Sequence, residues 1–556
     1  MKTKILYLLV SLALNSIILN AQNLEWVETI GGSGWDEAVS IKTDQDGNLY
    51  IIGYFRGTVD FDPSIATFNL TSVGEKDAFI LKIDSNGALV WVKQYGNGFL
   101  VESKDLAIDQ DGNIFIVGSF LGEVDFDPGS EEFILSSTLL DIDIFVQKFN
   151  NEGDFLWARQ ISGYYPPGEE HLYSCPANAH AIIVNSLGDL IITGYFDGIV
   201  DFDPNPSLDH HLTAVNASDI FVLNLSDDGN FNWVKQIGGS QGGVGNSIAL
   251  DDDDNIYYTG TIGGVFDFDP SEDIFNLSPS NEFMSEYYIS KLNNSGNFIW
   301  AKSLGSGSGL TIAVDNNGNI ISSGWFDTAS NPLLFKLDTN GDILWAKDLV
   351  GQWTDALTTD SEGNIYTAGF CTGINDFDPG VGVFNLQGEG AYIRKLDASG
   401  NFLWAGILDA LTSQVNIRAI TTDDSDNLYT VGIFDGDVDF DPNNSTNIEN
   451  TDILSYNFFI QKLYNSSLGL SENEMPNDIN IYPNPTIDGL IKIEYNRPIN
   501  SWSLNVYNAL GQLLKSKTLS NNKYAEIDIS NESSGIYFLE ILTIEYGSVT
   551  TKIIKE

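Results

Sequence analysis

A tryptophan-centred segment recurs seven times along this chain of 556 residues, and the repetition limits the folds that the chain can adopt. Each copy resembles "FLWARQISG", and neighbouring copies stand 45 to 76 residues apart. The tryptophans are Trp26, Trp91, Trp157, Trp233, Trp300, Trp345 and Trp404. A period of this size indicates one structural unit that is repeated and packed against its neighbours to bury a shared core.

Each repeat contains four segments with the pattern of β-strands; in the first unit they are "AVSIKTD", "NLYIIGYF", "DAFILKID" and "LVWVKQYG". The segments are short, rich in β-branched and aromatic residues and partly alternating, which favours strands over helices. Glycine bounds them at two aligned positions, where a tight hairpin would demand a positive φ. The first position holds Gly47, Gly112, Gly188, Gly318 and Gly363, with Asp254 and Asp426 in the other two units. The second position holds Gly87, Gly153, Gly229, Gly296, Gly341 and Gly400.

Four-stranded units repeated seven times predict an all-β fold, a seven-bladed β-propeller. The last unit runs through residues 458–464 without its tryptophan strand, whereas the first tryptophan strand, residues 24–32, precedes any complete unit. We therefore expect the N-terminal strand to complete the seventh blade, which closes the ring and removes exposed strand edges. An open β-solenoid is the structural alternative, and it explains the displaced strand less well.

The repeats between about residues 24 and 464 resemble the bacterial β-propeller repeats called SBBP repeats, which occur in secreted and surface proteins. The resemblance rests on the strand pattern described above, and it implies the propeller fold. It implies no particular activity, because propellers share a scaffold and not a chemistry.

The N-terminal stretch "MKTKILYLLVSLALNSIILNAQ" places two lysines before an apolar run that ends near the small residue Ala21. This pattern predicts a signal peptide over residues 1–21, followed by a propeller domain over 22–464. The apolar run is short for a membrane-spanning helix, so we expect no transmembrane segment in the mature chain.

The chain is strongly acidic, with 77 Asp and Glu against 26 Lys and Arg and a formal net charge of −51. Such a surface repels nucleic acid and anionic lipid, because both bind through cationic contacts, so we expect neither as a partner. It suits secretion, cation binding or solubility in salt, and a solvated acidic surface without a binding role is the simplest explanation. The two cysteines, Cys175 and Cys371, lie in different repeats, and a disulfide between them is not favoured.

A polar linker over residues 465–476 separates the repeats from a different pattern over residues 477–556. Alternating strands with Gly and Asn turns predict a small C-terminal β-sandwich there. Its motifs are "YPNP" (Tyr482, Pro483, Asn484, Pro485), "VYNALGQLL" with Gly511, "SGIYFLEI" with Gly535 and Tyr537, and the final "TKIIKE".

These motifs resemble those of the type A C-terminal sorting domain of the type IX secretion system. The resemblance implies an origin in Bacteroidota and export to the outer cell surface or the medium. It also implies the type IX machinery and a sortase-like peptidase as partners. A generic fibronectin-like module is the alternative.

The motif "VDFDP", or a close copy, occurs in six of the seven units and is absent from the fifth. Its acid pairs are Asp60 and Asp62, Asp125 and Asp127, Asp201 and Asp203, Asp267 and Asp269, Asp376 and Asp378, and Asp439 and Asp441. On an extended strand both acids would share one face, with the phenylalanine on the other. Two hard oxygen ligands favour Ca²⁺, although a full site needs about 6–8 oxygens. The alternative is structural: one aspartate caps backbone N–H groups while the phenylalanine packs between blades.

Other candidate motifs are weaker. The first hairpins, such as "TDQDGN" with Asp44, echo part of a calcium loop but lack the glutamate of its twelfth position, and the turn alone explains their residues. The segment "GGSQG", residues 238–242, matches a hydrolase motif without the helix that such a motif requires.

Repetition also argues against a catalytic role for the acid pairs, because glycoside hydrolysis needs two carboxylates in different environments. The sequence contains no asymmetric acid–base set, so we assign no catalytic residue. The symmetry breaks at an insertion after Trp157; all four histidines, His171, His180, His210 and His211, lie there or in the next unit. Their spacing fits no metal-binding motif, and a decorated loop is the simpler interpretation.

These patterns together predict an exported, noncatalytic binding or adhesion scaffold whose ligand is an extracellular glycan or protein. Two alternatives stay open. One is a secreted polysaccharide-active hydrolase or lyase, and the other is a surface protein stabilised by calcium.

Overall fold

The computed structural model describes residues 20–96, 100–137, 142–164, 175–281, 284–326, 333–349, 352–412, 414–443, 446–451, 455–467, 479–508, 513–543 and 547–555. They fall into two compact units, of which the larger spans Asn23–Tyr464 and the smaller contains the chain from Asn465 onward. The predicted signal peptide lies outside the described residues except for its last two, and so does the linker from residue 468. The described residues form strands and turns without a helix, so no helix there is long and apolar enough to cross a membrane.

The larger unit is built from antiparallel four-stranded sheets, in line with the predicted repeat. In the first sheet β2 (Glu37–Thr43), β3 (Leu49–Phe55), β6 (Asp77–Ile83) and β7 (Leu89–Tyr95) lie side by side in that order. The next units repeat this order with β8 (Leu100–Ile108), β9 (Ile114–Leu121), β12 (Asp143–Phe149) and β13 (Phe155–Gly163), then β14 (Ala177–Val184), β15 (Leu190–Phe196), β18 (Asp219–Leu225) and β19 (Phe231–Ile237).

One long strand, β25 (Phe298–Val314), ends the fourth sheet and begins the fifth. The fourth sheet starts with β20 (Gly243–Leu250), β21 (Ile256–Ile262) and β24 (Glu286–Leu292), and the fifth continues with β26 (Ile320–Phe326), β27 (Leu333–Leu337) and β28 (Ile343–Asp348). The sixth sheet contains β29 (Gln352–Thr359), β30 (Ile365–Asp376), β31 (Asn385–Leu396) and β32 (Phe402–Ala410). The last contains β33 (Gln414–Thr422), β34 (Leu428–Asp435) and β37 (Asn457–Ser467), with β1 (Asn20–Ile30) as its outer strand.

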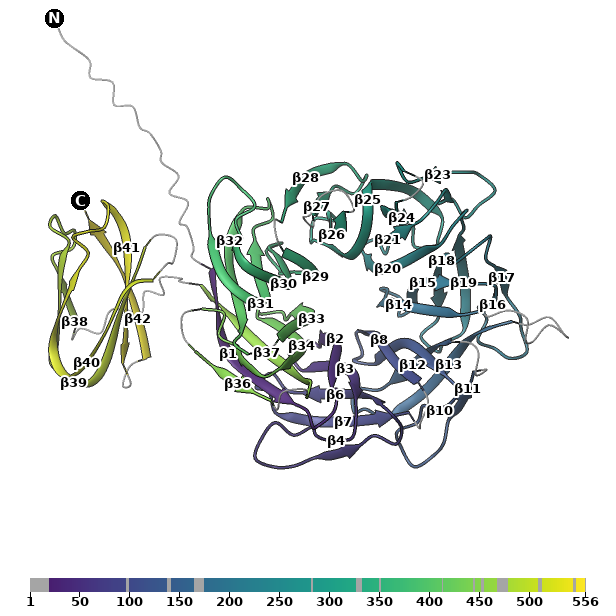
Figure 1. Cartoon of the computed structure of the whole chain (residues 1–556), viewed down its shortest axis with the longest axis horizontal. Helices are drawn as coiled ribbons and strands as arrows, with labels where there is room; N and C mark the ends of the chain where they lie inside the picture. Colours follow the sequence, from purple (N-terminus) through teal and green to yellow (C-terminus); the bar gives the residue numbers. More distant parts are fainter. Residues whose placement is uncertain are drawn as a thin grey trace, which may run out of the picture. The chain divides into compact units, whose positions relative to one another are not determined.

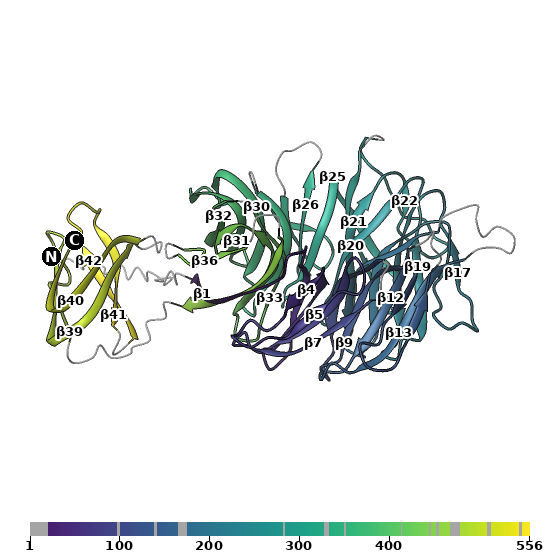
Figure 2. The same ribbon diagram turned by 60° about the horizontal axis from the view of Figure 1, so that its bottom comes forward.

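The sheets succeed one another around a common centre (Figure 1), and Figure 2 shows the same sheets turned by 60°. Each innermost strand contacts the innermost strand of the next sheet, from β2 to β8 and onward to β33, and β33 contacts β2. The hydrophobic cores lie between neighbouring sheets. In one core, Ile51 and Phe79 of the first sheet pack with Val431 and Phe458 of the last.

The predicted positive φ angles at the hairpins are confirmed. Gly47 has a φ of 77°, and the aspartates that replace glycine, Asp254 and Asp426, have φ values of 57° and 60°. Each of these aspartates also accepts hydrogen bonds from a serine turn of the preceding sheet, Asp254 from Ser186 and Asp426 from Ser361. These contacts between sheets offset the strain of a left-handed non-glycine residue.

The "DFDP" motifs form short hairpins at the outer side of the sheets. These are β4 (Thr58–Asp60) with β5 (Asn69–Thr71), β10 (Glu123–Asp125) with β11 (Ile134–Ser136), β16 (Ile199–Asp201) with β17 (His211–Thr213), β22 (Phe266–Asp267) with β23 (Asn276–Leu277), and β35 (Asp437–Asp439) with β36 (Ile448–Asn450). The sixth copy lies on extensions of β30 and β31.

The smaller unit is one antiparallel sheet that folds around a single core. Its strands are β38 (Ile479–Tyr482), β39 (Leu490–Asn508), β40 (Leu513–Asp528), β41 (Gly535–Thr543) and β42 (Gly547–Lys555). The N-terminal part of the long strand β39 pairs with β38, whereas its C-terminal part pairs with β41. Trp502, Ile491 and Leu539 are among the side chains that fill the core. Ile491 from the N-terminal part of β39 and Leu504 from its C-terminal part lie in this same core, and a β-sandwich stays a prediction for this unit.

Candidate binding site beside the central channel

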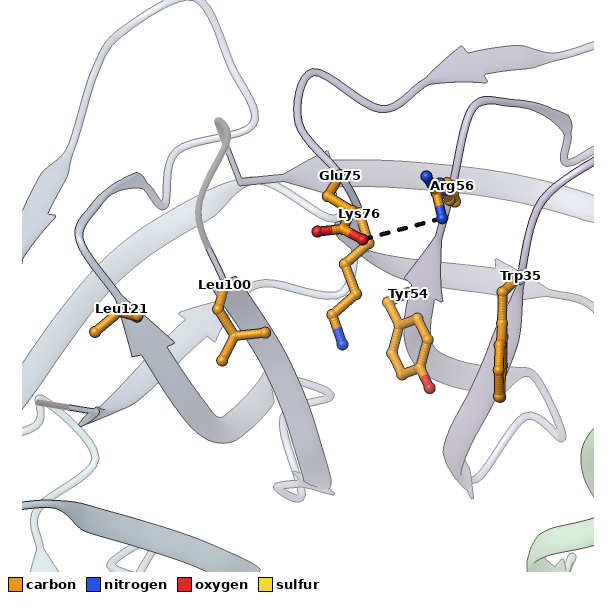
Figure 3. Close-up of a pocket in the computed structure, with 7 residues that line it drawn as sticks. All are labelled: Trp35, Tyr54, Arg56, Glu75, Lys76, Leu100 and Leu121. Atoms are coloured by element: carbon orange, nitrogen blue, oxygen red, sulfur yellow. Dashed lines mark ion pairs between the residues drawn. The ribbon is translucent and has the colours of Figure 1, made fainter. Parts of the chain in front are cut away.

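A pocket of about 550 Å³ opens on the larger unit between its first two sheets (Figure 3). Its lining residues come from segments far apart in the sequence: Trp35, Tyr54, Arg56, Glu75, Lys76, Leu100 and Leu121. Trp35 stands nine residues before the turn residue Asp44, and the equivalent residues of the other units are Leu100, Pro176, Gly242, Ser306, Gly351 and Gln414. The pocket therefore forms where the repeat symmetry is broken.

The pocket presents two aromatic rings and a cation. The side chain of Trp35 is held in place although it is 48% exposed, because it stacks on Tyr456 with ring centroids 4.6 Å apart. The Lys76 ammonium lies 4.2 Å from the centre of the Tyr54 ring, a cation–π contact. The opposite charges of Arg56 and Glu75 lie 4.0 Å apart at the exposed rim. Rigid aromatic faces beside a few charged groups are typical of a ligand-binding pocket.

Two glutamates connect the pocket to the centre of the ring. Glu37 accepts hydrogen bonds from the Trp35 indole at 3.2 Å, from the Tyr54 hydroxyl and from the Arg418 guanidinium at 2.7 Å. Glu102 accepts from Lys76 at 2.7 Å and from Lys104 at 2.9 Å. Burial alone would raise the pKa of Glu102, but the two lysines outweigh it and lower the pKa. Glu102 therefore stays ionised at neutral pH.

A third acid of the same segment behaves differently. Asp36 is fully buried, and burial raises its pKa from 3.8 to about 6, although its carboxylate accepts N–H groups of Arg56 and Gly32. The charge of Asp36 therefore changes just below neutral pH, directly between Trp35 and Glu37.

The central channel has a volume of about 460 Å³ and is lined by residues of all the innermost strands. One ring of lining positions carries Val39, Lys104, His180, Asn246, Leu310, Asp355 and Arg418. Burial raises the pKa of Asp355 although Arg418 opposes the shift, and burial and Lys104 lower the pKa of His180. The channel therefore has an asymmetric set of charges on a repetitive scaffold, which the sequence did not reveal because these residues lie far apart along the chain.

The "DFDP" carboxylates cap their own corners. Asp60 Oδ1 accepts the N–H groups of Asp62 at 3.1 Å and Phe68 at 2.7 Å, and Asp62 accepts the Ser64 N–H at 2.9 Å. The equivalent bonds recur at Asp125 and Asp127, Asp201 and Asp203, Asp267 and Asp269, Asp376 and Asp378, and Asp439 and Asp441. The phenylalanine between each pair is fully buried.

The expectation that both acids lie on one extended strand is wrong. Each strand ends at the first aspartate, because its side chain turns back to the N–H group two residues later. The corners instead join neighbouring sheets: β16 pairs with β13 of the preceding sheet, β35 pairs with β32, and Asp60 bridges to Gly31. The backbone caps and the buried phenylalanines of the structural interpretation are thus present. Binding of Ca²⁺ at these corners stays a prediction.

The first hairpins are held by their own side chains, as expected from the turn alone. Asp44 accepts the N–H groups of Asp46 and Asn48. Buried lysines of the third strand also reach these aspartates, for example Lys336 at 2.7 Å from Asp315 and Lys395 at 3.1 Å from Asp360. No local sequence pattern indicated these ion pairs, because the two partners belong to different strands.

The histidines do not come together in one site. His180 lies in the channel, His210 stacks near Phe231, His211 lies at the third corner, and His171 falls outside the described residues. Cys175 and Cys371 are both buried, and no disulfide joins them. Ser240 of "GGSQG" accepts the Val265 N–H at 3.0 Å in a turn.

The motifs of the C-terminal unit meet at its last strand. Asn484 donates to the Lys552 carbonyl at 2.6 Å and accepts the Ile554 N–H at 2.9 Å, so its side chain pairs with β42 like a strand. Lys555 is buried and donates to the carbonyls of Ile529, Ser530 and Glu532.

The other motif residues take neighbouring places in this unit. Tyr482 ends β38, and the peptide bonds before Pro483 and Pro485 are cis. Gly535 begins β41, and Tyr537 is buried in its core. Gly511 falls outside the described residues.

Comparison with known proteins supports both units. The family model of the secretion system C-terminal sorting domain matches residues 480–556, and that of a β-propeller repeat matches residues 232–267. An uncharacterized WD repeat-containing protein of Acanthamoeba polyphaga mimivirus is 26% identical over 350 residues. That match covers 55% of this chain, and the chain spans about a quarter of the viral protein, 25%.

Among solved structures, the Dos1 propeller aligns over 78% of this chain and 95% of its own, with 10% identity and a TM-score of 0.40. A Bacteroides vulgatus protein of the DUF3244 family, with an immunoglobulin-like β-sandwich fold, aligns over 14% of this chain and 85% of its own. It is 22% identical, with a TM-score of 0.13. The chain is thus an all-β protein of β-propeller repeats followed by a secretion system C-terminal sorting domain, which marks it for export through the type IX system.

Proposed function

We propose that the larger unit is a closed, seven-bladed β-propeller that acts as a noncatalytic binding protein at the cell surface or outside the cell. Closure is supported by the contact between β33 and β2, by the position of β1 at the edge of the sheet of β33, β34 and β37, and by the bond between Arg418 and Glu37. A closed ring leaves no strand edge open for aggregation, which suits an exported protein.

The ligand binds in the pocket of Trp35, Tyr54 and Lys76, and the exposed, pre-positioned Trp35 ring is the observation that carries this assignment. A glycan is the ligand that fits best. The apolar face of a sugar ring covers an indole, while its hydroxyl groups bond to the charged side chains at the rim. Because Tyr456 and Glu37 already fix the indole, little side-chain freedom is lost on binding.

The ionised state of Glu102, which bonds to Lys76 of the pocket, supports a noncatalytic role. A general acid must carry a proton near neutral pH, whereas two lysines lower the pKa of Glu102 and keep it ionised. A polysaccharide-active enzyme is the second candidate. Asp355 in the channel favours it, because its raised pKa suits proton donation.

A glycan array probed with the purified mature chain tests the proposal, followed by incubation with each polysaccharide that binds. We expect binding without the release of shorter saccharides. Sustained product release would overturn the noncatalytic assignment, and the absence of any glycan that binds would overturn the glycan assignment. Export is tested separately: deletion of residues 477–556 should leave the protein in the periplasm, and normal delivery outside the cell would contradict the role of the tail.

A further inference from the structure

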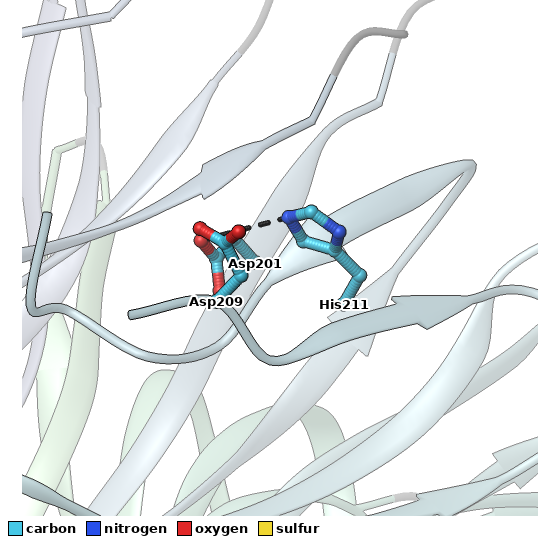
Figure 4. Close-up of side chains that lie close together, drawn as sticks. All are labelled: Asp201, Asp209 and His211. Carbon is cyan, nitrogen blue, oxygen red and sulfur yellow. Dashed lines mark ion pairs between the residues drawn. The ribbon is translucent and has the colours of Figure 1, made fainter. Parts of the chain in front are cut away.

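The third "DFDP" corner differs from its sister corners in the residues around its first aspartate. Among the described residues, one group of three potential metal ligands lies together, Asp201, Asp209 and His211, with ligand atoms within 4.8 Å of one another. Figure 4 shows the two carboxylates side by side, facing the imidazole. His211 Nε2 lies 3.7 Å from Asp201 Oδ2, whereas Asp201 Oδ1 caps the corner as in the other copies.

The sister corners show how the group arose. The residue paired with the first aspartate is Asn69, Ile134, Asn276, Asn385 or Ile448 in the other copies, and His211 in the third. The residue two positions earlier is Thr67, Glu132, Ile274, Val383 or Thr446, and Asp209 in the third. The third loop is also one residue longer: Asp201 accepts the N–H group nine residues ahead, whereas Asp60 accepts the one eight residues ahead. The third corner alone thus combines the common carboxylate with a second carboxylate and an imidazole.

The surroundings hold this group in position. The Tyr164 ring stacks on His211 with centroids 3.9 Å apart, which fixes the orientation of the imidazole. Two carboxylates this close repel each other, and a divalent cation between them removes the repulsion. Two ligands that bind Zn²⁺ tetrahedrally lie about 3.3 Å apart, since each is about 2.0 Å from the metal. The spacing of 3.7 Å between His211 and Asp201 is close to this value.

We propose that Asp201, Asp209 and His211 form a surface site for a divalent transition-metal ion, for which Zn²⁺ is the best fit. One imidazole and two carboxylates leave the fourth tetrahedral position to water. The imidazole favours Zn²⁺ over Ca²⁺, because calcium takes oxygen ligands. This site lies apart from the pocket at Trp35, and it shares Asp201 with the third of the repeated corners.

Titration calorimetry of the mature chain with Zn²⁺ tests the site, at an ionic strength of about 0.15 M and with excess Ca²⁺ to occupy nonspecific acidic sites. We expect one saturable site. The His211→Asn variant carries the residue that three of the other corners have at this position, so its corner should fold. We expect its affinity for Zn²⁺ to fall at least about tenfold. Asp209→Thr, which introduces the residue that the first corner has at this position, should show a similar loss.

The matched control is His210→Asn, because His210 is an exposed neighbour that stacks near Phe231 instead of joining the group. We expect this variant to bind Zn²⁺ like the wild type. The proposal is overturned if the wild type shows no saturable binding, if His211→Asn binds unchanged, or if His210→Asn loses as much affinity as His211→Asn. Thermal unfolding without metal should show equal stability for His211→Asn and the wild type. If His211→Asn does not fold, the Zn²⁺ affinity of Asp209→Thr tests the proposal instead, and unchanged binding by that variant overturns it.

Discussion

The guanidinium of Arg418 donates to the carboxylate of Glu37 across 2.7 Å, although the two residues stand 381 positions apart in the chain. The bond joins the innermost strand of the last sheet to that of the first, and the same carboxylate accepts from Trp35 and Tyr54. Glu37 therefore links two residues of the pocket, Trp35 and Tyr54, to the contact between the last sheet and the first.

The proposed closure of the propeller predicts that β1 stabilises the whole larger unit. A chain that starts at residue 32 lacks β1 and exposes the edge of β37, so we expect its melting temperature to fall by about 5 °C or more relative to a chain that starts at residue 22. Differential scanning calorimetry measures the difference. An equal melting temperature for both versions would show that the ring does not depend on the N-terminal strand.

The corner bonds predict a graded response at Asp60. Asp60→Ala removes the acceptor of two N–H groups and should lower the free energy of unfolding by about 1–3 kcal/mol. Asp60→Asn keeps an acceptor oxygen, so its free energy of unfolding should fall by less than half of the decrease in Asp60→Ala. Urea unfolding of the two variants provides the comparison.

If the corners bind calcium, unfolding measurements on the Asp60 variants should give a different result. If Asp60 and Asp62 bind Ca²⁺, both substitutions should destabilise the protein equally, and a chelator should lower the wild-type melting temperature. Because the capping bonds need no ion, we expect equal melting temperatures with Ca²⁺ and with chelator. A lower value in chelator would favour the calcium interpretation.

The buried Asp36 predicts a pH-dependent contribution to stability. Its pKa of about 6 in the folded protein is above the ordinary value of 3.8, so the folded state binds the proton more tightly. This contribution to the free energy of unfolding is up to about 3 kcal/mol. It is fully present below pH 3.8 and is lost as the pH rises through about 6. The wild type should therefore gain stability relative to Asp36→Asn between pH 7 and pH 4, by urea unfolding at each pH. A constant difference would contradict the raised pKa.

The last strand predicts unequal roles for two lysines of the sorting domain. Lys555→Met leaves three carbonyls without their donor and should destabilise this unit by about 1–3 kcal/mol. Lys552→Met, three residues earlier on the same strand, removes a less buried amine and is the matched control. Calorimetry of the full chain should show a shifted transition for Lys555→Met alone. Equal shifts for both variants would mean that the carbonyl cap is unimportant.

The sequence predicted the strands and turns well, because glycine at a positive φ and alternating apolar residues are local signals. The aspartates at 254 and 426 show this, since their conformation followed from alignment with glycines. The sites depended on distant contacts instead. No local pattern brings Trp35 to Tyr456 or Glu37 to Arg418, and the place where the strand ends at Asp60 follows from a side-chain bond. The group around His211 depends on the cross-strand pairing of His211 with Asp201, ten residues earlier, which no spacing motif predicts.

The binding claim is tested most directly by titration calorimetry with the glycan that binds best on the array, comparing the wild type with Trp35→Ala. The control is Phe68→Ala, because Phe68 is 44% exposed and lies at the first corner, outside the pocket. Loss of a central aromatic contact typically costs about 2 kcal/mol or more of binding free energy. We therefore predict that Trp35→Ala raises the dissociation constant for the glycan about thirtyfold, and that Phe68→Ala leaves it unchanged. An unchanged dissociation constant for Trp35→Ala would contradict the pocket as the binding site.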